Sequence, residues 1–239
     1  MKYAKVRKAE FIVRDNRFVA QVQLDGEVIP VHVKNTGRCR ELLLPGSTVY
    51  LADSLIPDGG PKRKYRYDCI AVERKLPDGS TVLINFDSGA PNICAGEWLR
   101  EKAPFGKPLL LRPETVFGDS RFDFYMETET AKSFIEVKGV TLLGSDGLAL
   151  FPDAPTARGL KHIKGLCECA AQGYSAAILF VVQFSGSRGF SPNVPMQPDF
   201  AAALSDAAAN GVHVLALECD VSPDEMRIKG SVPVLLSSS

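Results

Sequence analysis

Residues 121–140, RFDFYMETETAKSFIEVKGV, decide the fold of the second half of the chain. Two runs rich in Phe, Ile and Val flank a short polar stretch, a pattern that predicts an antiparallel hairpin. Side chains alternate along a strand, so Asp123, Glu136 and Lys138 share one face if Asp123 pairs with Lys138. In that register Glu136 is a diagonal neighbour of Asp123, about 7–8 Å away between backbones, and a slip of one residue would separate them.

These three side chains suggest a metal site. Two buried carboxylates repel each other, and a hard cation that prefers oxygen ligands would remove the conflict. We therefore predict that Asp123 and Glu136 bind Mg²⁺ or Mn²⁺, with Glu114 as a third acid. Lys138 is placed to stabilise charge on a phosphate, so Asp123, Glu136 and Lys138 are the candidate catalytic residues for phosphodiester hydrolysis. The alternative is a cross-strand ion pair on a solvated sheet face.

The rest of the second half predicts a mixed sheet with flanking helices, taken as a domain over residues 81–239. An antiparallel meander followed by alternating helices and strands is typical of such sheets. The strands are expected at 81–86, 109–117, 122–127, 134–142, 177–184 and 212–217, and the helices at 95–102, 156–172 and 198–209.

The first eighty residues alternate short β-type runs with turns, and we take them as a separate domain, 1–80. Five strands with a helix-forming stretch at 38–44 between the third and fourth match a small OB-type barrel, although a two-sheet sandwich would have a similar pattern. The strands are expected at Glu10–Arg14, Arg17–Leu24, Val28–Lys34, Ser47–Ala52 and Tyr65–Arg74.

Charge is distributed unevenly, although the chain as a whole is neutral. Residues 1–82 carry 15 Lys and Arg against 10 Asp and Glu, and the remainder carries 13 against 18. A basic half suggests that a polyanion binds there. The densest basic stretch lies between the fourth and fifth expected strands, in a loop that OB barrels use on oligonucleotides. It comprises Lys62, Arg63, Lys64, Tyr65 and Arg66.

The cations of this stretch would neutralise phosphates, and Tyr65 and the neighbouring Tyr67 would stack on bases. The same alternation also suits a strand whose aromatic residues are buried. Arg38 and Arg40 are expected to extend the basic surface. Arg158, Lys161 and His162 share one helix face near a helix N-terminus, where cations are unfavourable unless they serve an anion, so they are predicted to contact phosphate.

Composition excludes several classes of protein. With 45% hydrophobic residues among 239, the chain can bury enough apolar surface to fold. The longest apolar run is too short for a helix that crosses a bilayer, and the N-terminus does not have the pattern of a secretory signal. We therefore expect a cytoplasmic protein that does not enter a membrane, whose six cysteines pack as small apolar residues.

Five ordered segments also carry a resemblance to a known family. The chain resembles the sugar fermentation stimulation protein A (SfsA) family over nearly its whole length. The segments that match are Asn35-Thr36-Gly37, Lys62-Arg63-Lys64-Tyr65, Arg121-Phe122-Asp123-Phe124, Ile135-Glu136-Val137-Lys138 and Phe151 to His162.

This resemblance implies an OB-like domain followed by a domain of the PD-(D/E)xK nuclease class. It also implies DNA binding without strong sequence preference and a role in regulating sugar (maltose) catabolism. By the resemblance, Asp123 and Glu136 are metal ligands, Lys138 is the catalytic lysine and Glu114 is a further acid. Phe122 stands where the class name has its proline.

Three hypotheses follow. The first is a DNA-binding regulator with a nuclease-like metal site, and the second is an active Mg²⁺-dependent DNA endonuclease. The third is a protein-interaction module with no role on DNA. The expected partner is double-stranded DNA bound without sequence specificity, because no helix has an evident base-reading face. A homo-oligomer is compatible with the sequence.

Overall fold

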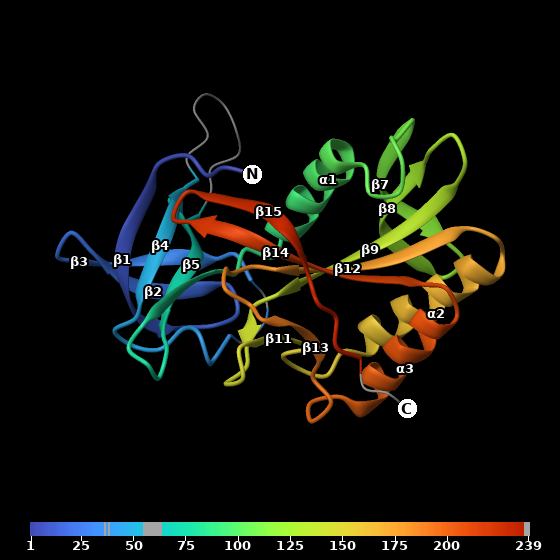
Figure 1. Cartoon of the computed structure of the whole chain (residues 1–239). Coiled ribbons are helices and arrows are strands. Elements are labelled where there is room, and N and C mark those ends of the chain that lie inside the picture. The colour runs from blue at the N-terminus through green and yellow to red at the C-terminus, as the bar shows by residue number, and fades with distance from the viewer. Residues whose placement is uncertain (36, 38, 55–63, 237–239) are drawn as a thin grey trace. The chain divides into compact units, whose positions relative to one another are not determined.

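The computed structural model describes residues 1–35, 37, 39–54 and 64–236 (Figure 1). The chain divides into two compact units. The first contains Met1–Ala90 with Gln183–Ser185 and Asp220–Arg227, and the remaining residues form the second. The first unit extends past the expected boundary at residue 80 because the sixth strand joins its sheet.

The first unit is a closed barrel. Its strands follow the order β3-β2-β1-β4-β5-β6, and β3 also pairs with β5 in parallel at His32 and Asp68. That pairing closes β1 to β5 into a ring, which confirms the OB-type barrel over the two-sheet sandwich. The strands are β1 (Val6–Arg14), β2 (Val19–Leu24), β3 (Glu27–Val33), β4 (Thr48–Asp53), β5 (Tyr67–Lys75) and β6 (Thr81–Asn85).

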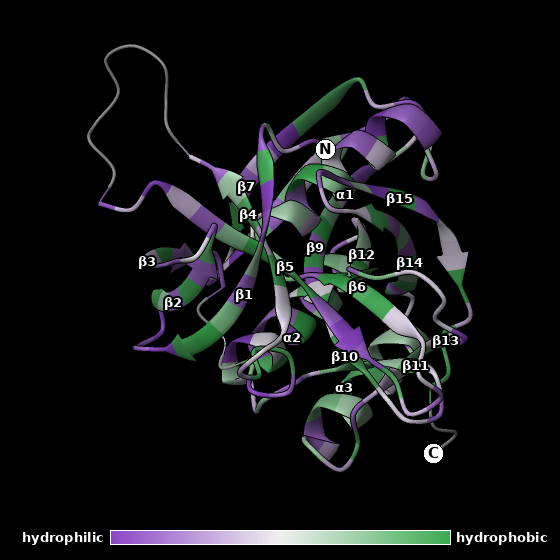
Figure 2. Cartoon of the chain, turned by 90° about the vertical axis from the view of Figure 1, so that its left-hand side faces the viewer, coloured by the Kyte–Doolittle hydropathy of each residue, from purple (hydrophilic) through white to green (hydrophobic). Residues whose placement is uncertain are grey.

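Alternating hydropathy builds the core of this barrel (Figure 2). In β2, the side chains of Ala20, Val22 and Leu24 are buried, whereas Gln21 and Gln23 face outward or are half-buried. This period of two is what a strand with one buried face requires. The barrel interior is therefore specified by the sequence pattern itself.

A helix was expected at 38–44, but the described residues 39–44 form none, so that prediction was wrong. Residues 40–42 form a turn, in which the amides of Leu42 and Leu43 both donate to the carbonyl of Cys39, at 3.2 and 3.0 Å. Cys39 has a φ of 45°, in the left-handed region. A residue in that conformation cannot lie inside a right-handed helix, so the segment turns instead.

The second unit contains a mixed six-stranded sheet of order β15-β14-β12-β9-β8-β7. β7, β8 and β9 are antiparallel neighbours, whereas β12 is parallel to both β9 and β14. The strands are β7 (Leu110–Phe117), β8 (Ser120–Glu127), β9 (Lys132–Val140), β12 (Ser175–Val182), β14 (His213–Ser222) and β15 (Glu225–Val232). A small sheet adds β10 (Leu142–Leu143), β11 (Leu148–Phe151) and β13 (Gly189–Pro192).

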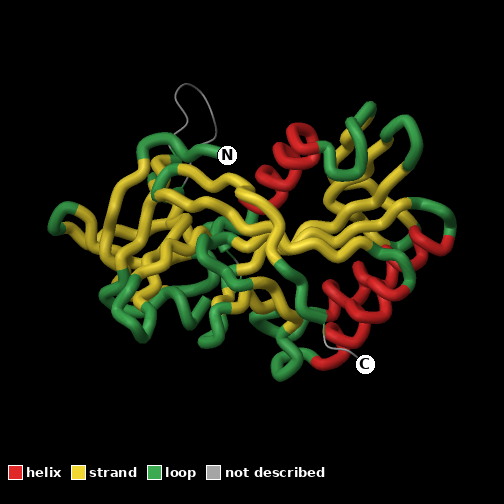
Figure 3. Tube along the Cα trace, in the orientation of Figure 1, coloured by secondary structure: helices red, strands yellow, loops and turns green. Residues whose placement is uncertain are grey.

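Helices cover both faces of this sheet, as expected. α2 (Ala157–Ala171) and α3 (Pro198–Ala209) lie together on one side, and α1 (Ala90–Lys102) lies on the other (Figure 3). Among the described residues, no helix combines the length and apolar character needed to cross a membrane. Five of the six cysteines are buried.

Two local features fix α2 against the sheet. Thr156 caps the helix, and its hydroxyl accepts a hydrogen bond from the Gly159 amide at 2.9 Å. Gly165 permits close approach, because a Cβ there would lie 2.9 Å from Ser120 Oγ and 3.0 Å from Phe122 Cζ in β8. The helix is therefore held close to β8, and this approach brings one of its polar side chains to the sheet.

Candidate functional site

The β8–β9 hairpin has a different register from the one expected. Phe124 pairs with Ile135 and Tyr125 with Phe134, two residues away from a register that would pair Asp123 with Lys138. The strands join through a tight turn in which the Thr128 amide donates to the Ala131 carbonyl at 2.9 Å, and this turn sets the pairing.

The pairing of β8 with β9 extends to Phe124 and Ile135, and Asp123 and Glu136 are the next residue along each strand beyond this last pair. The two carboxylates are close enough for the charge of Glu136 to raise the pKa of Asp123. They therefore come from neighbouring positions of adjacent strands.

Asp123 is held by two donors. Its Oδ2 accepts a hydrogen bond from the backbone amide of Val137 at 2.7 Å. The side chain thus occupies an amide that would otherwise be available to pair with a backbone carbonyl of the neighbouring strand. Its Oδ1 accepts from Nδ2 of Asn92, in α1, also at 2.7 Å. The carboxylate is thus fixed in position from both the sheet and the helix.

Glu136 is buried, with 2% of its side chain exposed. Its Oε1 contacts both Lys138 Nζ and His162 Nδ1. Its Oε2 is buried and has no hydrogen-bond partner in the part of the chain that the structure describes. On the far side of the imidazole, Arg158 Nε donates to His162 Nε2 at 3.4 Å. A buried carboxylate oxygen with no donor is costly, and a cation would satisfy it.

The two carboxylates differ in their electrostatic environment. Burial raises the pKa of Asp123, and the nearby charge of Glu136 raises it further, against the opposing effect of the Val137 amide, Asn92 and Lys138. Burial also acts to raise the pKa of Glu136, but hydrogen bonds and charge from His162 and Lys138 outweigh it and hold this pKa below its ordinary value. The folded state therefore favours the ionised form of Glu136 and disfavours that of Asp123.

This arrangement fits a hard divalent cation. Asp123 and Glu136 offer carboxylate oxygens from facing strands, and one of those oxygens lacks any other partner within the described residues. Across the described ranges, no cluster of three His, Cys, Asp or Glu side chains is suited to hold a metal ion. Mg²⁺ is commonly held by one or two carboxylates and keeps several waters, so a pair is sufficient.

The structure does not bring Glu114 to this pair. Its side chain is 69% exposed, and Oε2 lies 3.4 Å from Arg121 Nη1. Its backbone adopts a φ of 49°, and no strand pairing is made between Glu114 and Asp123, although Pro113 and Thr115 on either side are paired with β8. The left-handed conformation interrupts the regular alternation of side chains in β7 at this residue.

Glu114→Gln is accordingly expected to leave divalent-ion affinity within about twofold of the parent protein, as is usual for exposed surface changes. Isothermal titration with Ca²⁺ or Mg²⁺ would measure it. A loss of tenfold or more would return Glu114 to the ligand set.

The basic stretch before β5 is only partly described, because Lys62 and Arg63, like Arg38, lie outside the described residues. Lys64 is exposed, with Nζ 5.3 Å from the ring centroid of the half-buried Tyr65. Arg66 pairs with Asp53 Oδ2 at 3.1 Å and lies over the ring of Tyr67, which is buried. Lys64 and Tyr65 thus remain accessible, whereas the charge of Arg66 is partly compensated.

The three residues of α2 that were predicted to contact phosphate differ in their exposure to solvent. Arg158 and Lys161 are exposed, as expected of phosphate contacts. His162 is buried against Glu136 and Lys138, with its ring 6.0 Å from that of Phe122. Its position gives no support to a direct contact with nucleic acid, and it acts instead as a partner of the Glu136 carboxylate.

Sequence reasoning missed two parts of the molecule. Asn92 orients Asp123 from 31 residues away, and no local pattern signals such a contact. A basic pocket in the barrel was also not predicted: Arg40 was expected only as part of the basic surface, and Arg14 and Arg17, which flank the Asp15-Asn16 turn and line the pocket with it, were not singled out.

An OB-type barrel joined to a mixed-sheet unit with an acid–acid–lysine cluster defines a two-domain class of protein. Two family models match: the SfsA N-terminal OB domain over residues 12–84, and the sugar fermentation stimulation protein RE domain over residues 89–225. The chain belongs to the SfsA family.

Relatives and a solved structure agree with this assignment. Sugar fermentation stimulation protein homologues from Desulfitobacterium hafniense strain Y51 and Ruminiclostridium cellulolyticum are 44% and 45% identical over 236 residues, covering 99% of this chain and 99% and 100% of theirs. The structure described as Pyrococcus furiosus SfsA in complex with Ca²⁺ matches with a TM-score of 0.80 and 27% identity over 98% of both chains.

Proposed function

We propose that this chain binds DNA without sequence specificity and holds a divalent cation, Mg²⁺ or Mn²⁺ in the cell, at Asp123 and Glu136. One observation supports the metal most directly: Glu136 Oε2 is buried with no donor among the described residues, on a carboxylate whose charge raises the pKa of Asp123. The related Pyrococcus furiosus protein is described in complex with Ca²⁺, a hard cation with the same preference for oxygen ligands.

The DNA partner is supported by exposed cations on both units. Arg158 and Lys161 lie in the first turns of α2, the helix that also supplies His162 to Glu136. On the barrel, Lys64 and Tyr65 precede β5, in the loop position that OB barrels use on oligonucleotides. Cations that release counterions from phosphates bind duplex DNA of any sequence. A role in regulating sugar catabolism is part of this proposal, and the name of the relatives, sugar fermentation stimulation protein homologues, supports it.

Hydrolysis of DNA is the second candidate, and Lys138 is the observation that favours it. Its ammonium is 14% exposed and contacts Glu136 beside the proposed cation. When bound, the cation would polarise the phosphodiester. Lys138 is then placed to offset the negative charge that develops on the phosphate while one P–O bond breaks and one water is consumed. Asn92 and His162 keep the two carboxylates in position.

Fluorescence anisotropy with a labelled duplex tests the binding proposal. With chelator present, affinity should fall steeply with salt, and Arg158→Gln combined with Lys161→Gln should reduce the slope of log K against log salt by about 1.8, or 0.9 for each phosphate that is no longer neutralised. Lys102→Gln combined with Lys107→Gln removes the same charge from exposed positions of the same unit and is the matched control. A protein that ignores duplex DNA even at low salt would favour the protein-interaction module.

Cleavage is measured separately, on supercoiled plasmid with Mg²⁺ or Mn²⁺. If the chain is a nuclease, Lys138→Ala should lower the rate by about 100-fold or more while duplex affinity is retained. Equal cleavage by the parent and variant would point to a contaminant. Binding without cleavage in either metal would support the regulator and exclude the endonuclease.

A further inference from the structure

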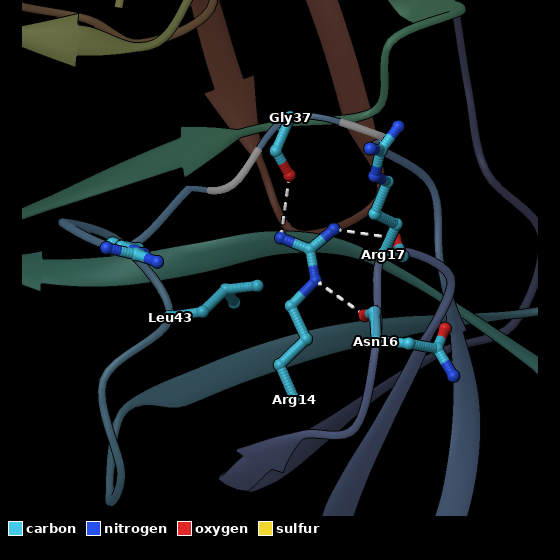
Figure 4. Close-up of a pocket in the computed structure, with 6 residues that line it drawn as sticks. Arg14, Asn16, Arg17, Gly37 and Leu43 are labelled. Carbon is cyan, nitrogen blue, oxygen red and sulfur yellow. Dashed lines mark hydrogen bonds between the residues drawn. The ribbon is translucent and has the colours of Figure 1, made fainter. Parts of the chain in front are cut away.

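The barrel contains a basic pocket that the proposed metal site does not use. It has a volume of about 330 Å³ and lies between the β1–β2 turn and the β3–β4 connection (Figure 4). A space of this size is at the lower end of pockets that accept small ligands. It is lined by Arg14, Asn16, Arg17, Gly37, Arg40 and Leu43.

Arg14 joins the two loops that form the pocket (Figure 4). Its Nε donates to the Asn16 carbonyl at 3.1 Å and its Nη1 to the Gly37 carbonyl at 2.7 Å. Its Nη2 donates to the carbonyls of Arg17 at 2.6 Å and Asn35 at 2.7 Å. These four carbonyl oxygens are therefore occupied by Arg14 and are not available to repel an anionic ligand in the pocket. Arg14 is therefore a positioning residue that also contributes its positive charge.

Arg17 and Arg40 supply the cations that remain available. Both side chains are exposed, and neither is paired with a carboxylate among the described residues. Asp15, in the same turn, is engaged by Gln21, whose Nε2 donates to Oδ2 at 2.6 Å. Three guanidinium groups around one pocket repel each other unless an anion lies among them. The paired N–H donors of a planar guanidinium match the spacing of two phosphate oxygens.

An aromatic side chain stands next to this pocket in the chain. Phe18 follows Arg17, its amide donates to Asn16 Oδ1 at 2.9 Å, and its side chain is 52% exposed. An exposed Phe beside a phosphate site is a platform on which an unpaired base can stack. The loop between the first and second strands is also one that OB barrels use on oligonucleotides.

We propose that the pocket of Arg14, Arg17 and Arg40 holds a backbone phosphate of an unpaired DNA strand, with Phe18 stacked on the adjacent base. This inference rests on the proposed DNA binding and specifies where on the barrel a single strand is recognised. It gives the barrel a preference for unpaired DNA, whereas the cations of α2 serve a duplex.

The test is anisotropy with a labelled oligo-dT strand and a duplex of equal length, both in chelator. Arg17→Gln combined with Arg40→Gln should weaken single-strand binding about tenfold or more and reduce its salt slope by about 1.4, or 0.7 for each phosphate. Phe18→Ala should weaken it about fivefold or more. Lys2→Gln combined with Lys75→Gln removes the same charge from the same unit outside the pocket, and should change affinity by less than a factor of about two.

Each outcome decides the inference. If the parent protein binds the strand and the pocket variants bind it equally well, the inference fails and the proposed function stands. If the parent protein binds neither strand nor duplex, the proposed function itself fails. Inorganic phosphate and dTMP are assayed by thermal shift. If they stabilise the parent but not the pocket variants, while strand affinity is unchanged in those variants, the inference fails and the pocket serves a free phosphate compound instead.

Discussion

Replacing Glu136 by Gln is expected to lower divalent-ion affinity by about 100-fold or more, because the change removes a ligand and not only a supporting contact. The parent protein should gain about 2.7 kcal/mol of stability at a metal concentration 100 times its Kd, and the variant should gain almost none. Thermal unfolding with and without Ca²⁺ measures this difference, and titration calorimetry gives the affinity directly.

The same substitution should also destabilise the metal-free protein, by about 3 kcal/mol. Glu136 Oε1 contacts both Lys138 and His162, so a neutral amide leaves a partly buried ammonium without its counter-charge. Glu129→Gln makes the same change at an exposed position of the β8–β9 turn. It should alter neither the divalent-ion affinity nor the stability of the metal-free protein. A Glu136→Gln protein that retained its Ca²⁺ stabilisation would remove Glu136 from the ligand set.

The sequence predicted the hairpin of the site but not its register. Alternation in β8 and β9 is a local property, and the prediction that Asp123, Glu136 and Lys138 share a face rests on it. Register depends on which residues close the turn, and the polar stretch between the strands fits more than one closure.

Elements were predicted best where their signals are local. The helix at Pro198–Ala209 has the same bounds in the structure as in the sequence prediction, with proline at its start and Asn210-Gly211 at its end. The helix expected at 38–44 had good propensity, but Cys39 takes a left-handed φ that propensity does not anticipate. β11, β13 and β15 escaped prediction. β11 and β13 have four residues each, and such short strands have little periodicity to detect.

Side-chain partners from distant elements were beyond sequence reasoning. Charge and spacing on α2 suggested that His162 faces solvent with Arg158 and Lys161. The close approach at Gly165 instead brings α2 against β8 and buries the imidazole on Glu136. Such a contact depends on how a helix sits on a sheet, which spacing within the helix does not contain.

Asp123→Asn should have the opposite effect on stability from Glu136→Gln, although both should abolish metal binding. Burial and the charge of Glu136 hold the pKa of Asp123 above its ordinary value, so at neutral pH its charge lowers the stability of the folded state. An amide removes that charge. Its oxygen can still accept from the Val137 amide, and Asn92 can turn its own amide to accept from the new NH₂ group.

We therefore expect the metal-free Tm of Asp123→Asn to rise by about 2–4 °C, the change that ~1 kcal/mol causes in a chain of this size. The difference from the parent should vanish as pH falls through the folded-state pKa of Asp123, because the parent carboxyl is then neutral as well. Scanning calorimetry in chelator at neutral and acidic pH measures both effects.

A metal-free Tm that fell as in Glu136→Gln would mean that the hydrogen bonds of Asp123 outweigh its repulsion from Glu136. Retained Ca²⁺ stabilisation would mean that Asp123 is not a ligand. The combination of higher metal-free stability and an abolished metal response is what a carboxylate pair placed for a cation, and not for the fold, should produce.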